Sequence, residues 1–168
     1  EAAGGITYSL DLLGELLSLP QAVGIKMATL DSVMTYQDVA NYIQKHHPDK
    51  VLITGEDRMF GYTLTRGAKS ALVGLGSICP AWQRELLDSY ADGRAEDFLQ
   101  AMALVDALAE ITFIPPMEGY IERLQFFLAE QGILSHNVVH DPYGPGVTEL
   151  ERAQITKFIR EHGLEVGA

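Results

Sequence analysis

Hydrophobic residues along this chain fall into short continuous runs separated by helical stripes. Three runs are apolar without alternation, at residues 22–26, 51–54 and 71–75. Such runs are typical of strands that are covered on both faces of a sheet. Between them, apolar positions recur every three to four residues, which predicts helices. The first half of the chain therefore predicts alternating helices and strands.

Cap residues help to define the helices around these strands. Ser9 precedes a leucine-rich stripe, which predicts a helix over residues 10–19. Thr35 and Asp38 have the spacing of a capping box and predict the start of the next helix. A third helix is predicted over residues 59–66, just before the last strand.

After the third strand, the pattern becomes helical throughout. Apolar stripes predict helices over residues 81–92, 95–110 and 118–131. Thr148 and Glu151 have the capping-box spacing and predict the start of a final helix. The chain is thus expected to end in a block of helices.

Strands that alternate with helices are typical of parallel βαβ units. Three parallel strands alone would leave two open apolar edges, which native proteins rarely tolerate. Eight such units close into a barrel without edges, but a barrel needs about 250 residues. This chain has 168 residues and carries no initiator methionine, so we expect it to be part of a larger barrel.

Lys26 is the residue that first suggests chemistry, because it ends a strand that the pattern would bury. Burying an ammonium group without a fixed anion is costly, so burial favours the neutral amine. A neutral amine is what Schiff-base formation with a carbonyl substrate requires. The alternative is a structural lysine whose stem lies on apolar surface while its head stays in water.

Composition narrows the classes of protein that remain. The chain has 12 Lys and Arg against 23 Asp and Glu, a net charge of −11, which argues against nucleic-acid and anionic-membrane partners. No apolar run approaches the roughly 18 residues of a membrane span. The single cysteine, Cys79, lies in an apolar stretch, where we expect inert packing, and fits a reducing compartment. We therefore expect a cytoplasmic protein.

Two motifs have part of the pattern of a metal or cofactor site. His136, His140 and Asp141 have a metal-like spacing, but turn formers place them in a loop, and a structural zinc site needs four ligands. Gly74 and Gly76 lack the third glycine and the helix of a dinucleotide-binding motif. Neither a metal nor a cofactor is expected.

Three short motifs together resemble those of a known superfamily. Gly24-Ile25-Lys26 is similar to the motif that ends the sixth strand of the dihydrodipicolinate synthase and N-acetylneuraminate lyase superfamily of class I aldolases. Thr54-Gly55-Glu56-Asp57 resembles the turn after that family's next strand, and Gly67-Ala68-Lys69-Ser70 resembles the turn before its eighth. The resemblance implies that Lys26 forms a Schiff base with pyruvate or another 2-keto acid.

The resemblance covers essentially the whole chain, as the carboxy-terminal half of a family member. It implies an α/β fold made of the last three βα units of a TIM (β/α)8 barrel plus a carboxy-terminal helical extension. Residues 1–80 would be the barrel part, and residues 81–168 the last barrel helix and the helical region. The stretch after the lysine, residues 27–31, lacks the family's usual glutamate and glycine. The family's catalytic tyrosine lies further upstream, so Tyr8 is not assigned that role.

The resemblance also implies which residues line the site. Lys26 is expected to be the covalent nucleophile, and Gly55, Glu56 and Asp57 are expected to contact the distal part of the substrate. An alternative for the two acids is that they favour the amino terminus of the following helix. Leu72 is expected to present its main-chain carbonyl to pyruvate while its side chain lies in the core.

The function implied is a pyruvate- or 2-keto-acid-dependent Schiff-base lyase, an aldolase or synthase, that acts on a small molecule. The family resemblance also implies a homo-oligomer, specifically a tetramer. One alternative is a dehydratase of the same superfamily that acts on a keto-deoxy sugar acid. The other is a non-catalytic fragment or subunit that only assembles with the rest of the barrel. The segment alone is expected to be inactive, because the tyrosine and the carboxylate-binding turn lie on upstream strands.

Overall fold

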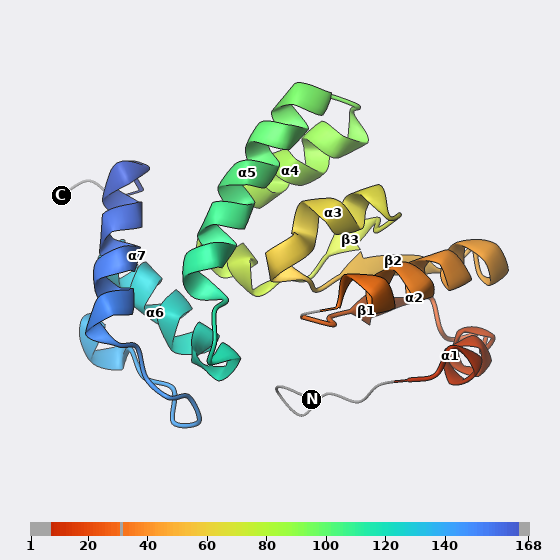
Figure 1. The fold of residues 1–168 in the computed structure, drawn as a ribbon, viewed down its shortest axis with the longest axis horizontal. Helices are drawn as coiled ribbons and strands as arrows, with labels where there is room; N and C mark the ends of the chain where they lie inside the picture. The colour runs from red at the N-terminus through yellow and green to blue at the C-terminus, as the bar shows by residue number, and fades with distance from the viewer. Residues whose placement is uncertain (1–7, 31, 165–168) are drawn as a thin grey trace.

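The computed structural model describes residues 8–30 and 32–164, so Asp31 of the predicted motif lies outside the described residues. The elements follow one another along the ribbon of Figure 1 as a sheet region and then a helical block. In chain order they are α1 (Leu10–Leu17), β1 (Gly24–Met27), α2 (Val33–His46), β2 (Val51–Thr54), η2 (Asp57–Met59), α3 (Phe60–Thr65), β3 (Ser70–Ala71), η3 (Gly74–Ser77), α4 (Pro80–Ala91), α5 (Ala95–Thr112), η4 (Met117–Gly119), α6 (Tyr120–Glu130), η5 (His136–Val138) and α7 (Glu149–Glu161).

The three strands form one parallel sheet in the order β1-β2-β3, as the strand and helix pattern predicted. Each crossover passes through a helix, α2 and then α3, which is the arrangement of a βαβ unit. Lys26 pairs with Ile53 in the register of β1 and β2, and Thr54 pairs with Ala71 in that of β2 and β3. The carboxyl ends of the strands therefore meet at one edge of the sheet.

The predicted strand over residues 71–75 is wrong in its extent. Only Ser70–Ala71 pairs with β2, and Gly74–Ser77 forms the 3-10 helix η3. The reason is local, because the N–H of Leu75 donates to the Asp57 carboxylate at 2.8 Å instead of joining a strand ladder. A buried carboxylate thus ends the strand early.

The helix caps follow the predictions at α1 and α7 but not at α2. Ser9 caps α1, and Thr148 and Glu151 form a complete capping box on α7. The start predicted for α2 from Thr35 and Asp38 is wrong, because Ser32 is the N-cap and accepts from the N–H of Thr35 at 3.1 Å. The helix consequently begins at Val33.

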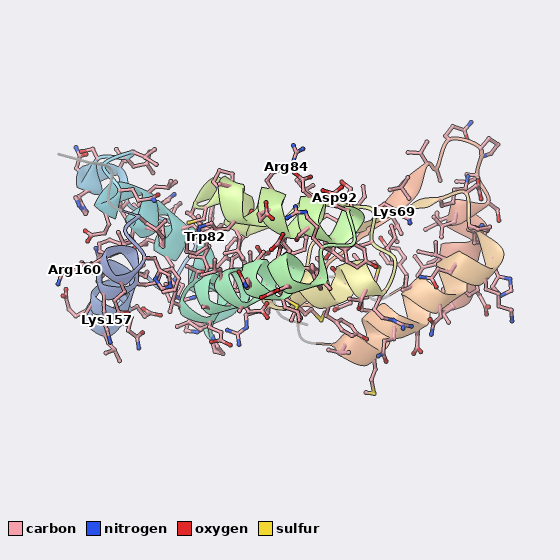
Figure 2. The ribbon with its side chains drawn as sticks, turned by 90° about the horizontal axis from the view of Figure 1, so that it is seen from above. Lys69, Trp82, Arg84, Asp92, Lys157 and Arg160 are labelled. Atoms are coloured by element: carbon pink, nitrogen blue, oxygen red, sulfur yellow. The ribbon has the colours of Figure 1, made fainter. Side chains whose placement is uncertain are left out.

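Two groups of buried apolar residues hold the chain together. The smaller group joins α1 and α2 to the middle strand and contains Leu13, Leu17, Tyr36, Val39, Ala40, Ile43 and Leu52. The larger group extends from α3 through α4 and α5 to α6 and α7. Figures 1 and 2 show α4 and α5 as a helical hairpin between the sheet region and the α6–α7 pair. Trp82 of α4 contacts that pair, with its ring centroid 6.2 Å from that of Phe158.

A buried arginine connects several segments of the helical block. Arg123 of α6 is fully buried and pairs with Glu151 of α7 at 2.7 Å. It also donates to the main-chain carbonyls of Thr112, Ile114 and Pro116 at the end of α5 and beyond. One side chain therefore joins three segments of the helical extension.

The sheet has two open edges within the described part of the chain, since β1 and β3 each pair only with β2 there. Val23, just before β1, is 77% exposed, and Leu72, just after β3, is 64% exposed. The expectation that the Leu72 side chain lies in the core is wrong, because no further strand among the described residues packs beside β3. An uncovered apolar edge on each side is what a partial barrel presents.

Hydropathy gives one further result for the described helices. None of them alone is long and apolar enough to cross a membrane. The pair Ala95–Thr112 and Met117–Glu130 together has the length and apolar composition of a membrane span, but the two helices are bent by 104° relative to each other. The division into residues 1–80 and 81–168 stays a prediction.

Candidate functional site

Lys26 lies near the carboxyl end of β1, one residue before the strand ends. The burial that the sequence pattern predicted for it is wrong, since Lys26 is exposed. The reason is the open edge of the sheet, because no described strand pairs with the outer side of β1 to cover the ammonium group. In this chain Lys26 therefore has a fixed strand position but no enclosing pocket.

Gly55 makes room for the Lys26 side chain. A Cβ atom at Gly55 would lie only 2.3 Å from Lys26 Cε and 3.0 Å from the carbonyl oxygen of Met27. The N–H of Gly55 donates to that same carbonyl at 2.6 Å, which ties the turn after β2 to the end of β1. The lysine stem thus crosses directly over a glycine of the neighbouring strand's turn.

Asp57 follows Gly55 on the same turn and is 5% exposed. Its Oδ1 accepts from the N–H of Leu75 at 2.8 Å. Burial raises the pKa of Asp57 to about 6, even though hydrogen bonds from the N–H groups of Leu75 and Gly74 and the charge of Lys26 act to lower it. A carboxyl group that titrates near pH 6 can exchange a proton under physiological conditions.

Glu56 turns the other way, toward the loop that follows Lys26. Its side chain is 1% exposed, and Oε1 accepts from both the N–H and, at 2.8 Å, the hydroxyl of Thr29. Its other oxygen, Oε2, accepts from the N–H of Leu30 at 2.8 Å. Glu56 is the N-cap residue of η2 and Asp57 lies in its first turn, as the helix-terminus alternative expects, but the Glu56 side chain forms no cap hydrogen bond there. The sequence held no sign of this contact, because the partners lie 26 and 27 residues apart.

Leu72 lies beside the same turn through its main chain. Its N–H donates to the carbonyl of Thr54 at 2.8 Å, directly before Gly55. The structure therefore brings Lys26, Gly55, Asp57 and the main chain of Leu72 together at the carboxyl ends of the strands.

Two tyrosines, Tyr8 and Tyr36, are not assigned as the proton shuttle for Lys26. Tyr8 is 46% exposed and precedes α1. Tyr36 of α2 is fully buried, and burial raises its pKa to about 12, with the hydroxyl of Thr63 opposing the shift and the Glu56 charge adding to it. A phenol with that pKa stays protonated at neutral pH.

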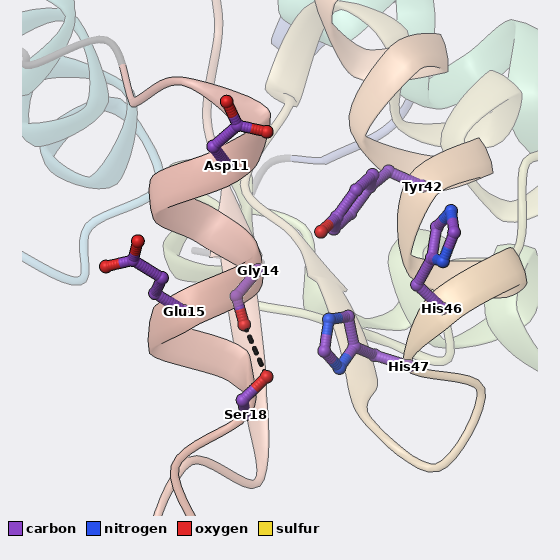
Figure 3. A pocket seen from close by; sticks show the side chains of 7 residues that line it. All are labelled: Asp11, Gly14, Glu15, Ser18, Tyr42, His46 and His47. Carbon is purple, nitrogen blue, oxygen red and sulfur yellow. Dashed lines mark hydrogen bonds between the residues drawn. The ribbon is translucent and has the colours of Figure 1, made fainter.

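A separate hollow of about 670 Å³ lies between α1 and the end of α2 (Figure 3). None of the predicted site residues lines it. Its lining residues, all polar except Gly14, are Asp11, Gly14, Glu15, Ser18, Tyr42, His46 and His47. Throughout residues 8–30 and 32–164, no three His, Cys, Asp or Glu side chains are grouped so that they could hold a metal ion. Cys79 is buried, and burial raises the pKa of its thiol to about 11, as expected for an inert packing residue.

The fold and this edge of the sheet define part of an α/β barrel with a lysine at the end of a strand. The chain belongs to the dihydrodipicolinate synthetase family, whose model matches residues 2–162. The resemblance predicted from the sequence motifs is therefore confirmed.

Individual relatives agree with this assignment. N-acetylneuraminate lyase 2 of Escherichia coli O6:H1 is 25% identical over 144 residues, which are 86% of this chain and 45% of that protein. The crystal structure of dihydrodipicolinate synthase from Aquifex aeolicus superposes with a TM-score of 0.80 at 13% identity, covering 95% of this chain and 52% of its own. N-acetylneuraminate lyase from Fusobacterium nucleatum, solved with pyruvate, has a TM-score of 0.70 at 16% identity and covers 94% and 50%.

The chain spans about half the length of the curated relatives that it matches. The structural neighbours share its fold over that half, which confirms a partial TIM barrel with a helical extension.

Proposed function

We propose that the full-length protein containing this chain is a Schiff-base lyase, an aldolase or synthase, that acts on pyruvate or another 2-keto acid. The observation that carries the proposal is the position of Lys26 at the carboxyl end of β1, with its stem across Gly55. In α/β barrels, catalytic groups come from this end of the strands. Membership in the dihydrodipicolinate synthetase family supports the same chemistry.

The chemistry assigned to Lys26 needs no cofactor. The neutral amine attacks the keto carbon of the substrate, and the carbinolamine loses water to give an iminium ion. Loss of a proton from the adjacent carbon then gives an enamine, whose electron pair can form a carbon–carbon bond. In the reverse direction, the iminium accepts the electron pair of the bond that breaks.

The neighbouring residues would define the substrate end of the site. In this proposal the main chain of Leu72 contacts the pyruvate part of the substrate, and Gly55, Glu56 and Asp57 shape the distal part. Asp57 is proposed to exchange a proton or to accept from a substrate hydroxyl, because burial raises the pKa of its carboxyl group to about 6. The homo-oligomer implied by the family stays a prediction.

Exchange of the pyruvate methyl protons in D2O tests the proposal without knowledge of the second substrate. Enamine formation at Lys26 exchanges these protons, which one-dimensional NMR follows directly. We expect the full-length protein to catalyse exchange and Lys26→Arg to abolish it. Lys69→Arg is the matched control, because Lys69 is an exposed lysine at the sheet end of the molecule (Figure 2). Exchange that survives Lys26→Arg would contradict the proposal.

The dehydratase alternative uses the same lysine and therefore gives the same exchange. The products formed from a keto-deoxy sugar acid separate the two activities, since a dehydratase releases water and keeps the carbon chain whole. A full-length protein without any exchange would leave the non-catalytic alternative.

A further inference from the structure

Glu56 is the most completely buried carboxylate near Lys26, with 1% of its surface exposed. A carboxylate in such a place is costly unless hydrogen bonds satisfy its oxygens. Here both oxygens are satisfied by a single neighbour, the loop between β1 and α2, through Thr29 and Leu30. That loop begins two residues after Lys26.

The loop needs such an anchor because its backbone is strained. Leu30 has a φ of 65°, in the left-handed region that a leucine rarely adopts. Residues held in that region cost free energy and persist only when their surroundings fix them. The N–H of Leu30 is one of the groups that Glu56 holds, so the carboxylate fixes the strained residue directly.

The same contacts extend the link between the first two strands beyond the sheet. The last main-chain hydrogen bond between β1 and the turn after β2 runs from the N–H of Gly55 to the carbonyl of Met27. Beyond that bond and past Ala28, the Glu56 carboxylate accepts hydrogen bonds from Thr29 and Leu30 of the loop. The loop after β1 and the turn after β2 are thereby held together beside the Lys26 stem.

We propose that Glu56 is a positioning residue for Lys26. Its carboxylate accepts hydrogen bonds from Thr29 and Leu30, fixes the loop after β1 and so holds the lysine stem across Gly55. This inference rests on the proposed function for its kinetic consequence. It assigns to Glu56 an action through the loop, in addition to any contact with substrate.

The decisive experiment compares Glu56→Gln with Glu122→Gln in the full-length protein. Glu122 is a matched control, because it is also buried, at 6% exposed, and accepts from two loop N–H groups, those of Asp141 and Val147. Both variants lose a carboxylate that holds a loop, but only one of the two loops follows Lys26.

The readout is the rate at which borohydride traps pyruvate on Lys26, measured as a function of pH. We expect Glu56→Gln to lower the plateau rate at high pH by about 10- to 100-fold, because small misplacements of a reacting group have costs of this size. Glu122→Gln should leave the plateau unchanged. The direction of the change in trapping rate distinguishes a positioning role from a charge effect. Removing a nearby negative charge favours the neutral amine and would speed trapping at neutral pH, whereas a loss of positioning slows it.

A second variant, Thr29→Val, tests the proposal even if Glu56→Gln does not fold. Thr29→Val removes only the hydroxyl donor and leaves the two N–H donors, so a smaller decrease in the plateau is expected. Hydrogen exchange of the Thr29 and Leu30 amides should accelerate in Glu56→Gln, whether or not Lys26 is reactive. An unchanged plateau in both variants would overturn the proposal, and so would unchanged amide exchange. A parent protein that traps no pyruvate would instead overturn the proposed function.

Discussion

Replacing Gly55 by alanine tests the contact between the turn after β2 and the Lys26 side chain. The new Cβ would lie 2.3 Å from Lys26 Cε in the present arrangement. Carbon atoms in contact stay roughly 3.5–4.0 Å apart, so Cε must retreat by about 1.2–1.7 Å. The far end of a lysine is flexible and can move away, whereas Ala28 Cβ and the Met27 carbonyl oxygen, each 3.0 Å from the new Cβ, need to shift by only a few tenths of an ångström. The substitution therefore displaces the amine more than the backbone.

A displacement of about 1 Å can cost on the order of 100-fold in rate. We therefore expect Gly55→Ala to slow pyruvate methyl exchange by about 10- to 100-fold, which corresponds to about 1.4–2.7 kcal/mol in the activation free energy. The assay is the NMR exchange measurement in D2O with saturating pyruvate, together with a thermal unfolding curve to show that the variant is folded.

Gly76→Ala is the control for this substitution. A Cβ at Gly76 has one neighbour within 4 Å, the Oε1 atom of Gln83 at 3.5 Å, which is an ordinary contact. This variant should keep the exchange rate of the parent protein. A folded Gly55→Ala protein with the parent rate would refute the reasoning, because the lysine stem would then not depend on the space above Gly55.

Two further predictions concern stability, both measured as free energies of unfolding in the full-length protein. Arg123→Met should lower that free energy by about 3–5 kcal/mol, because it leaves the buried Glu151 carboxylate without its partner; a urea midpoint close to that of the parent would contradict this. Burial raises the pKa of Asp57 from its ordinary value of 3.8 to about 6 in the folded protein, so the folded state binds more protons than the unfolded state between these values. Stability relative to Asp57→Asn should thus fall by about 2–3 kcal/mol as pH rises from about 4 to about 7 and stay level above that range. A difference that is independent of pH would contradict the burial argument.

Much of the sheet region was predictable because its signals are local. Apolar runs between turn residues indicated the three strands, and their alternation with helices indicated parallel pairing, which the structure confirms. The capping box of Thr148 and Glu151 on α7 was predictable for the same reason, since the two residues are three positions apart. Patterns of this kind depend only on neighbours in the chain.

Apart from the N-cap of α2, which depends on the local contact between Ser32 and Thr35, the errors come from contacts between distant segments. The strand predicted over residues 71–75 ends early because Asp57, 18 residues upstream, takes the N–H of Leu75. The exposure of Lys26 depends on what lies beside the outer edge of β1, which the composition of the strand itself cannot indicate. The contacts of Glu56 with the loop join residues that are 26 and 27 positions apart, so no local pattern indicated them.

The central claim is that Lys26 is the residue that bonds to the keto acid. Peptide mapping by mass spectrometry tests it most directly, after borohydride reduction of the full-length protein in the presence of pyruvate. We expect the peptide containing Lys26 to carry the mass of one reduced pyruvate and Lys26→Arg to remove the adduct. An adduct on another lysine, or no adduct in a folded protein incubated with pyruvate, would contradict it.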